Sequence, residues 1–368
     1  MDGSILTKIL AFFMSIFIAI GNFFGFNLQP EEPKEIKNVI YLIGDGMGFN
    51  HLEKTKAERE IALTMDKLPI RGSSQTESLT AKVTDSAAGG TALATGIRTG
   101  NGRIGVYNDD PYSEASYPKN LTELCMENGM MTGVITTDST TGATPASFSS
   151  HVASREMSAE ISADQLVSGI DLIWGKAASE ITVSNAEANG YQYISTYDEM
   201  MALEEGSRSF GQFTSSLWTT EQSNKNTPTL EQMAVKAVDL LDDTDEGFFL
   251  MIEGAHIDKH SHNNDDDEMT EALESFDKTI KAMLSYAMES GDTLVVVTAD
   301  HETGAITLSE DNYIFTSDSH SAADVPLLVY GSDKLISDGE VVKNMEIPAR
   351  IARILGFTEE QFPVSVKK

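Results

Sequence analysis

Five apolar runs of strand length, each close to residues that can bind a metal or a phosphate, restrict the fold of this chain more than any other feature. A run that is apolar on both faces is typical of a buried strand in a parallel sheet. In open α/β sheets, ligands bind at the carboxyl ends of such strands. The sequence therefore predicts a sheet with a polar site along one edge, built from the runs 38–43, 132–137, 248–252, 293–298 and 326–330.

Helical patterns separate these runs. In the clearest of them, 229–241, apolar residues recur at the spacing of one helix face. The region 186–229 is mixed and polar and predicts no clear element. Because strand and helix alternate, the chain is predicted to be α/β, with one large domain at 38–368 whose mostly parallel central sheet is flanked by helices on both faces. Other helices are predicted at 51–61, at 121–128 and at 269–288, and the segment 161–173 is predicted to be a helix followed by a short strand.

The charge balance excludes some partners. The 368 residues include 26 Lys and Arg against 57 Asp and Glu, a formal net charge of −31. This argues against a nucleic acid partner and against an anionic membrane surface. Bound metal ions would use some of the carboxylates, and an acidic surface suited to salty surroundings is a compatible alternative. The single cysteine, Cys125, excludes an internal disulfide and cysteine-rich zinc modules.

The N-terminus predicts export. Lys8 precedes an apolar run at 9–20, and small residues follow at a plausible cleavage point. We interpret 1–26 as a signal peptide and 27–37 as a linker, which predicts a periplasmic or secreted protein. An uncleaved membrane anchor is the alternative, since the apolar run extends to Phe26, and a buried core helix is a third.

One serine lies in an unusual setting, between Asp85 and a run of very small residues that lets another surface approach closely. If a helix begins at Ser86, its hydroxyl lies at the positive end of the helix dipole, where an alkoxide or a phosphate oxygen is stabilised. Serine needs a base or a metal to become a nucleophile at neutral pH. No Gly-x-Ser-x-Gly elbow surrounds it. The alternative is that Asp85 or Ser86 simply caps the helix.

Candidate ligands follow the predicted strands. Carboxylate with imidazole suits zinc, and carboxylate with hydroxyl suits magnesium. Asp258 and His262 are four residues apart, on one face if that turn is helical, and His256 and His260 are rivals with the same spacing. Singly, a strand-end aspartate can be a cap and residues 300–301 an ordinary turn. The strand-end candidates are Asp45, Thr144, Glu253, Asp300 and His301.

Five motifs in a fixed order carry a family resemblance. They lie at 42–48, 84–88, 143–155, 253–262 and 298–301. Through them the chain resembles the alkaline phosphatases from about residue 38 to 330. The resemblance implies hydrolysis of phosphate monoesters, with release of inorganic phosphate, at a site with two zinc ions and one magnesium ion per chain.

The resemblance also implies a role for each site residue. Ser86 matches the nucleophile that forms a phosphoserine intermediate, and Arg155 matches the residue that clamps two phosphate oxygens. A surface salt bridge is the alternative for Arg155. The implied metal ligands are Asp45, Asp300 and His301 for one zinc; Asp258, His262 and His320 for the other; and Asp45, Thr144 and Glu253 for magnesium.

Three features of the sequence depart from the family pattern. Gly142 stands where relatives carry Asp or His beside the magnesium, which predicts a third site that relies more on water. The interval between His301 and His320 is short, which weakens the family-based expectation of a homodimer. Lys259 stands where some relatives have Trp or His. It is predicted to contact phosphate through water, and a solvated side chain is its alternative.

Other functions are less consistent with these residues. A phosphodiesterase or phosphonate hydrolase of the same superfamily commonly uses threonine as its nucleophile, and a sulfatase uses a modified cysteine, whereas this chain has Ser86. A non-catalytic phosphate- or metal-binding protein is the second alternative, although every implied catalytic position is filled.

Overall fold

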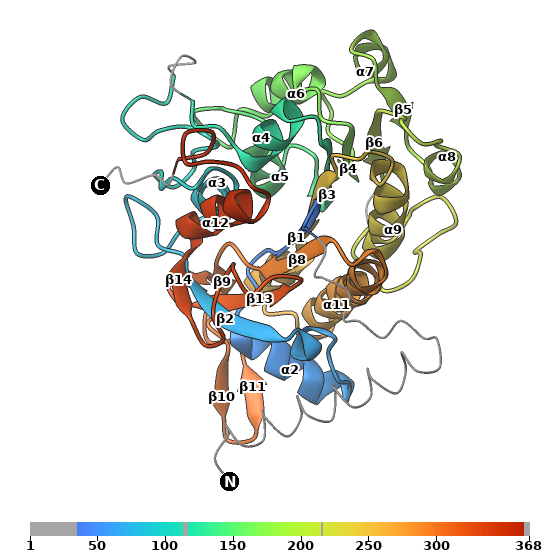
Figure 1. Ribbon diagram of the computed structural model, residues 1–368. Coiled ribbons are helices and arrows are strands. Elements are labelled where there is room, and N and C mark those ends of the chain that lie inside the picture. The colour runs from blue at the N-terminus through green and yellow to red at the C-terminus, as the bar shows by residue number, and fades with distance from the viewer. Residues whose placement is uncertain (1–34, 113–116, 215, 364–368) are drawn as a thin grey trace, which may run out of the picture. The chain divides into compact units, whose positions relative to one another are not determined.

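A ten-stranded sheet forms the centre of the structure, a computed structural model that describes residues 35–112, 117–214 and 216–363 (Figure 1). β13 is antiparallel to both of its neighbours, and the other neighbouring pairs are parallel, which confirms the predicted α/β fold with a mostly parallel sheet. In spatial order the strands are β14 (Val341–Lys343), β2 (Ile70–Gln75), β13 (Val325–Tyr330), β8 (Thr293–Thr298), β1 (Asn38–Gly44), β7 (Phe248–Gly254), β3 (Met131–Ser139), β4 (Leu172–Lys176), β6 (Ser209–Phe213) and β5 (Gln192–Ile194).

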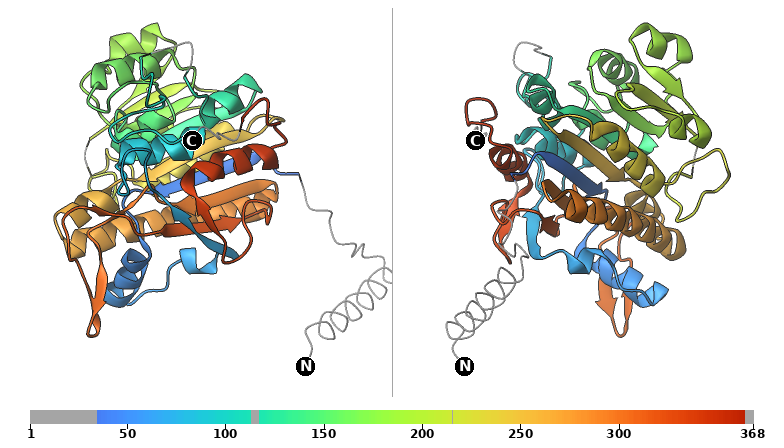
Figure 2. Two further views of the ribbon diagram at one scale, coloured as in Figure 1. Left: turned by 90° about the vertical axis from the view of Figure 1, so that its left-hand side faces the viewer. Right: turned by 45° about the vertical axis from the view of Figure 1, so that its right-hand side comes forward.

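The central strands are apolar on both faces because helices cover both faces (Figure 2). In β1, Ile40 and Leu42 belong to one apolar core and Val39 and Tyr41 to the other. The first core is closed by α2 (Phe49–Arg59), α9 (Leu230–Leu241) and α11 (Asp266–Ser290). The second is closed by α3 (Ser86–Thr95), α4 (Leu121–Glu127), α6 (Ser158–Val167) and α12 (Ile347–Ile354).

Some predicted elements differ in detail. The helix predicted at 51–61 is α2, but its inner face is buried, including the side chains of His51 and Lys54. The segment 161–173 contains the end of α6 and the start of β4, as predicted, whereas 186–229, for which no clear element was predicted, contains the parallel strands β5 and β6. The remaining elements are η1 (Met65–Lys67), α5 (Ala143–Ser147), α7 (Val183–Ala188), α8 (Tyr197–Met201), α10 (His256–His262), β9 (Glu302–Thr303), β10 (Thr307–Ser309), β11 (Asn312–Ile314), β12 (His320–Ser321) and η3 (Asn344–Glu346).

Among the described residues, none of the helices combines the length and the apolar character needed to span a membrane. The predicted signal peptide or anchor at 1–26 lies outside the described residues, as does most of the predicted linker.

Candidate active site

Three neighbouring strands bring carboxylates to one edge of the sheet. In the register of the sheet, Ile43 of β1 lies beside Glu253 of β7 and beside Thr298 of β8, so Asp45 and Asp300 follow their strands at the same level. Directly after Asp45 the backbone turns sharply at Gly46, whose φ is +72°. The Gly46 N–H donates a hydrogen bond to Asp300 Oδ1 at 3.2 Å. A Cβ at Gly46 would lie 2.8 Å from the Cβ of Asp258, so this position needs glycine.

The helix predicted to begin at Ser86 does so. Asp85 is its N-cap and accepts a hydrogen bond from the backbone of Ala88 at 3.0 Å. Ser86 is 5 % exposed, and its hydroxyl oxygen lies 3.2 Å from His301 Nε2. The small residues allow this approach, because a Cβ at Gly89 would lie 2.9 Å from the carbonyl oxygen of Asp300.

Helix α10 separates the two rival ligand pairs. His262 Nε2 lies 3.4 Å from Asp258 Oδ1 and 3.1 Å from His320 Nε2, so these three side chains meet at the site. His256 and His260 instead contact the ring of Trp218, with centroid distances of 5.4 and 4.4 Å. The structure therefore brings Asp258 and His262 to the site, whereas His256 and His260 pack against Trp218.

His320 reaches the site through a short hairpin-like pairing. β12 is antiparallel to β9, with His320 opposite Thr303, and His320 Nδ1 lies 2.9 Å from the carbonyl oxygen of Thr84. Its ring stacks on that of His301 at a centroid distance of 3.6 Å. The same segment positions Asp258, whose carboxylate accepts a hydrogen bond from the Thr303 hydroxyl.

Two groups of donor atoms are close enough to hold a metal ion. In each, the candidate ligand atoms lie within 4.8 Å of one another, and His301 belongs to both. Asp45 Oδ1 and Asp300 Oδ2 are buried without a hydrogen-bond partner among the described residues. Buried polar atoms of this kind are normally paired, so they fit a bound cation. The groups are Asp45, Asp300 and His301, and Asp258, His301 and His320.

The pKa shifts in this cluster come first from burial and then from repulsion between its carboxylates. Burial, followed by the charges of Asp300 and Asp258, raises the pKa of Asp45 well above its ordinary value. Burial and the charge of Asp258 raise the pKa of Asp300 to about 6. Burial and then His320 lower the pKa of His301 to about 3, so its ring is neutral and able to bind a metal. A divalent cation would relieve the repulsion.

The predicted magnesium ligands lie beside this cluster. Thr144 is in the first turn of α5, and its hydroxyl is buried with no hydrogen-bond partner in the described part of the chain. Glu253 accepts a hydrogen bond from the Thr136 hydroxyl. Burial, and after it the charge of Asp138, raises the pKa of Glu253 to about 8. These oxygen atoms suit a hard cation such as magnesium.

Sequence reasoning missed Asp138, whose carboxylate forms an ion pair with Lys259. Lys259 is 40 % exposed, so it is neither buried nor a simply solvated side chain. The available signal was a carboxylate at the end of a predicted strand, four residues before Gly142.

Arg155 lies at the outer side of the site. Its Nη1 is 3.2 Å from Asp85 Oδ2, and its backbone N–H donates to the carbonyl oxygen of Gly102 at 2.7 Å. Burial opposes its charge, but Asp85, Asp45 and Asp300 outweigh burial and raise its pKa. The guanidinium is therefore charged and held beside the helix that begins with Ser86.

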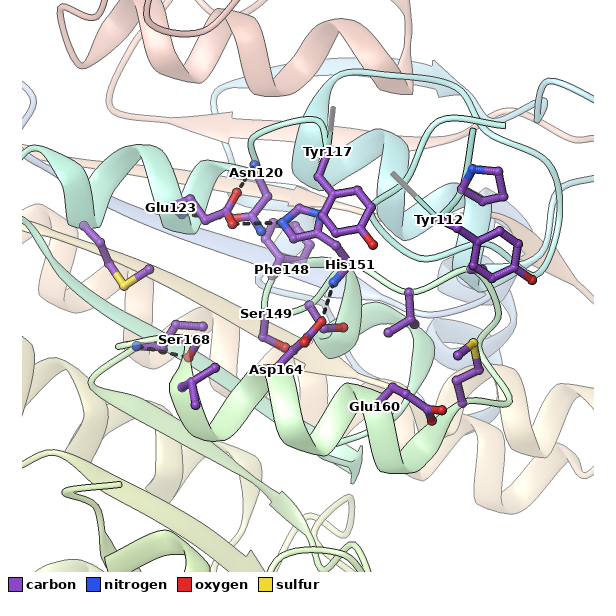
Figure 3. Close-up of a pocket in the computed structure, with 18 residues that line it drawn as sticks. Tyr112, Tyr117, Asn120, Glu123, Phe148, Ser149, His151, Glu160, Asp164 and Ser168 are labelled. Carbon is purple, nitrogen blue, oxygen red and sulfur yellow. Dashed lines mark hydrogen bonds and ion pairs between the residues drawn. The ribbon is translucent and has the colours of Figure 1, made fainter. Parts of the chain in front are cut away.

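A separate cavity of about 530 Å³ contains none of the predicted ligands (Figure 3). It is lined by His151, Val152 and Ala153, which precede Arg155, and by side chains of α4 and α6. In Figure 3 the His151 ring points toward Glu123, and their closest atoms are 2.8 Å apart. Both candidate metal-binding groups lie at the carboxyl edge of the sheet, so we assign the active site to that edge and not to this cavity.

Fold and site together define an α/β protein with two candidate metal-binding groups at the carboxyl edge of its sheet. The family model described as "Alkaline phosphatase" matches residues 36–183 and 175–335. The chain belongs to the alkaline phosphatase family, whose members are phosphoric monoester hydrolases.

Individual relatives agree. The chain is 35 % identical over 298 residues to alkaline phosphatase 3 of Bacillus subtilis, covering 75 % of this chain and 63 % of that protein. It is 31 % identical over 358 residues to alkaline phosphatase 4 of the same organism, covering 90 % and 75 %. The chain thus spans less than two thirds of the first of these relatives.

Solved structures show the same fold. The alkaline phosphatase of the Antarctic bacterium TAB5 has a TM-score of 0.77 at 30 % identity, covering 89 % of this chain and 100 % of that one. A His-to-Glu variant of that enzyme, described with magnesium bound in its M3 site, has a TM-score of 0.76 at 29 % identity, with the same coverage.

Proposed function

We propose that this protein hydrolyses small phosphate monoesters through a phosphoserine intermediate on Ser86, and that it holds two zinc ions and one magnesium ion per chain. The observation that carries the proposal is the position of the Ser86 hydroxyl. It lies at the N-terminus of α3 and 3.2 Å from Nε2 of His301, a residue that belongs to both donor groups. When bound, the cations would lower the pKa of this hydroxyl and offset the charge of the phosphate oxygens.

The residues present fit these ions. Each donor group mixes carboxylate with imidazole, as zinc prefers, and the hydroxyl and carboxylate of Thr144 and Glu253 suit magnesium. The magnesium bound by the TAB5 variant supports the choice of this metal for the third site. We assign Asp45, Asp300 and His301 to one zinc; Asp258, His262 and His320 to the other; and Asp45, Thr144 and Glu253 to magnesium.

The side chains divide the reaction between them. The Ser86 oxygen attacks phosphorus while the bond from phosphorus to the alcohol oxygen breaks, and water then displaces the Ser86 oxygen and releases phosphate. The planar fork of Arg155 matches two phosphate oxygens. The free N–H groups in the first turn of α3 and its dipole favour the anion. Lys259 would contact phosphate through water.

Turnover of p-nitrophenyl phosphate by the metal-loaded protein tests the proposal. We expect a chelator to abolish turnover, and we expect Ser86→Ala to abolish it while zinc content and phosphate binding remain. Ser162→Ala, which removes another buried hydroxyl far from the ligands, is the matched control and should behave as wild type. Full activity of Ser86→Ala would contradict the proposal. Preference for bis-p-nitrophenyl phosphate would favour the phosphodiesterase.

Export to the periplasm or the medium is also part of the proposal, and the sequence of residues 1–26 supports it. Fractionation of cells that express the full chain tests it. We expect activity outside the cytoplasm, and recovery in the membrane fraction would indicate that the segment stays as an anchor. A chain that stays in the cytoplasm would contradict export.

A further inference from the structure

The space beside Gly142 is already filled by a carboxylate. A Cβ at Gly142 would lie 2.8 Å from Asp138 Oδ2, closer than a side-chain contact allows. Any larger residue at position 142 would therefore have to displace Asp138. The chain carries its carboxylate at the end of β3 and not at the N-cap of α5, where Gly142 stands.

Asp138 also lies next to Glu253. β3 and β7 are neighbouring strands, with Thr136 beside Glu253 in the register. The Thr136 hydroxyl donates to the Glu253 carboxylate and accepts a hydrogen bond from the Asp138 backbone at 2.8 Å. Burial raises the pKa of Glu253, and the negative charge of Asp138 raises it further. Two carboxylates thus lie near each other, with Glu253 buried and the Asp138 side chain 25 % exposed.

A third oxygen, the Thr144 hydroxyl, lies beside the Glu253 carboxylate. The Thr144 residue is 1 % exposed, and its hydroxyl has no hydrogen-bond partner among the described residues. Leaving a buried hydroxyl unpaired costs about 1–3 kcal/mol, so such groups normally have a ligand. Two carboxylates and a hydroxyl are a hard oxygen set, which suits magnesium and not zinc.

We propose that Asp138 supplies its Oδ2 to the magnesium ion bound by Thr144 and Glu253, and so replaces a ligand that position 142 lacks. This inference rests on the proposed function, because it extends the third metal site assigned there. Lys259 holds the other oxygen, Oδ1, and fixes the direction of the carboxylate. The positive charge of Lys259 also lies near the ion and weakens its binding.

Titration of magnesium into the zinc-loaded protein, followed by calorimetry and by metal analysis after dialysis, tests the inference. We expect wild type to bind one magnesium ion per chain. Asp138→Asn should weaken magnesium binding about 10- to 100-fold, the usual effect of losing a group that supports a metal. The zinc content should not change, since Asp138 belongs to neither zinc donor group.

Two further variants keep the test valid if Asp138→Asn folds poorly. Lys259→Met should tighten magnesium binding severalfold, because it removes a nearby positive charge and leaves the carboxylate. Asp138→Ala combined with Gly142→Asp moves the carboxylate to position 142 and should restore binding to near the wild-type level.

Asp239→Asn is the matched control, because it also removes a lysine-paired carboxylate but from the exposed side of α9.

The outcomes separate this inference from the proposed function. Equal magnesium affinity in wild type, Asp138→Asn and Asp239→Asn would overturn it, as would a zinc-loaded wild type that binds no magnesium. Failure of the proposed function would instead appear in the zinc content and in the turnover of Ser86→Ala. Magnesium binding is measured without substrate, so it does not depend on that result.

Discussion

At the scale of single residues, Asp85 connects the two side chains that are expected to contact phosphate. Its carboxylate caps α3 through the backbone of Ala88, accepts a hydrogen bond from Gly102 at 2.9 Å and lies 3.2 Å from Arg155. The helix that presents Ser86 and the guanidinium are therefore held by one group. A fixed guanidinium loses less entropy when it binds phosphate.

Asp85→Asn separates the capping role of this residue from its charge. Asn is an equally good N-cap, so we expect the melting temperature to change by only a few degrees. Arg155 loses its ion pair and becomes less well oriented, so the inhibition constant of inorganic phosphate should rise severalfold. Steady-state inhibition and thermal unfolding measure the two effects. An unchanged inhibition constant would show that Asp85 does not position Arg155.

Single residues also show how far the sequence could predict the site. Asp258 and His262 were predictable in part, because helical spacing places them on one face, although His256 and His260 share that spacing. The structure places Asp258 and His262 3.4 Å apart. The pair of Asp138 with Lys259 was not, since it joins residues 121 positions apart and depends on how α10 meets the end of β3. No local pattern encodes such a contact.

At the scale of elements, the N-terminus of α4 stabilises the segment that leads to Arg155. Glu123 accepts a hydrogen bond from the backbone of Asn120, as part of a capping box, and its other oxygen lies 2.8 Å from His151 Nε2. The second ring nitrogen of His151 lies 2.6 Å from the carbonyl oxygen of Gly105. Both partners accept hydrogen bonds, so the doubly protonated imidazolium form of the ring would satisfy both of them.

The stability contribution of this ion pair is expected to depend on pH. Burial alone would lower the pKa of His151, but Glu123 outweighs it and the pKa is raised. The pair therefore stabilises the fold fully below pH 6.5, the ordinary pKa of histidine, and the contribution is lost as pH rises through the folded pKa. Glu123→Gln keeps the capping box but removes the charge. At pH 6 it should lower the free energy of unfolding by about 1–2 kcal/mol.

Urea unfolding of wild type and Glu123→Gln at pH 6 and pH 9 measures this contribution. The difference between the two proteins should shrink at the higher pH. Glu127→Gln removes the exposed partner of Lys119 on the same helix and should show little change between the two pH values. An equal effect of Glu123→Gln at both pH values would mean that His151 is not charged in the folded protein.

Elements also differ in how well the sequence encodes them. The strands β1, β7 and β8 are buried on both faces, so their continuous apolar runs identify them, whereas β3 carries Thr132, Thr136 and Thr137 among its buried residues. The edge strand β5 and its neighbour β6 come from a mixed, polar region of the sequence and were missed. Helix α5 has five residues with a proline inside, too short for a helical period to appear.

At the scale of the whole molecule, buried negative charge at the sheet edge makes the metal-free protein sensitive to pH. Glu253 has a pKa of about 8 in the folded state, against an ordinary value of 4.5. Between these values the folded state holds a proton that the unfolded state has lost, so the free energy of unfolding falls as pH rises. Below pH 6.5 the effect is hidden, because buried neutral histidines such as His301, with a pKa of about 3, act in the opposite direction.

The window between pH 6.5 and 8 therefore tests the charge of the site. In the metal-free protein, Glu253 alone should reduce the free energy of unfolding by up to about 1.4 kcal/mol per pH unit. Bound zinc and magnesium keep the carboxylates ionised in the fold, so this slope should largely disappear in the loaded protein. Glu253→Gln should reduce the slope of the metal-free protein, and His151 contributes equally with and without metal. Chemical denaturation across the window, with and without a chelator, measures both slopes, and equal slopes would mean that no cation neutralises this edge of the sheet.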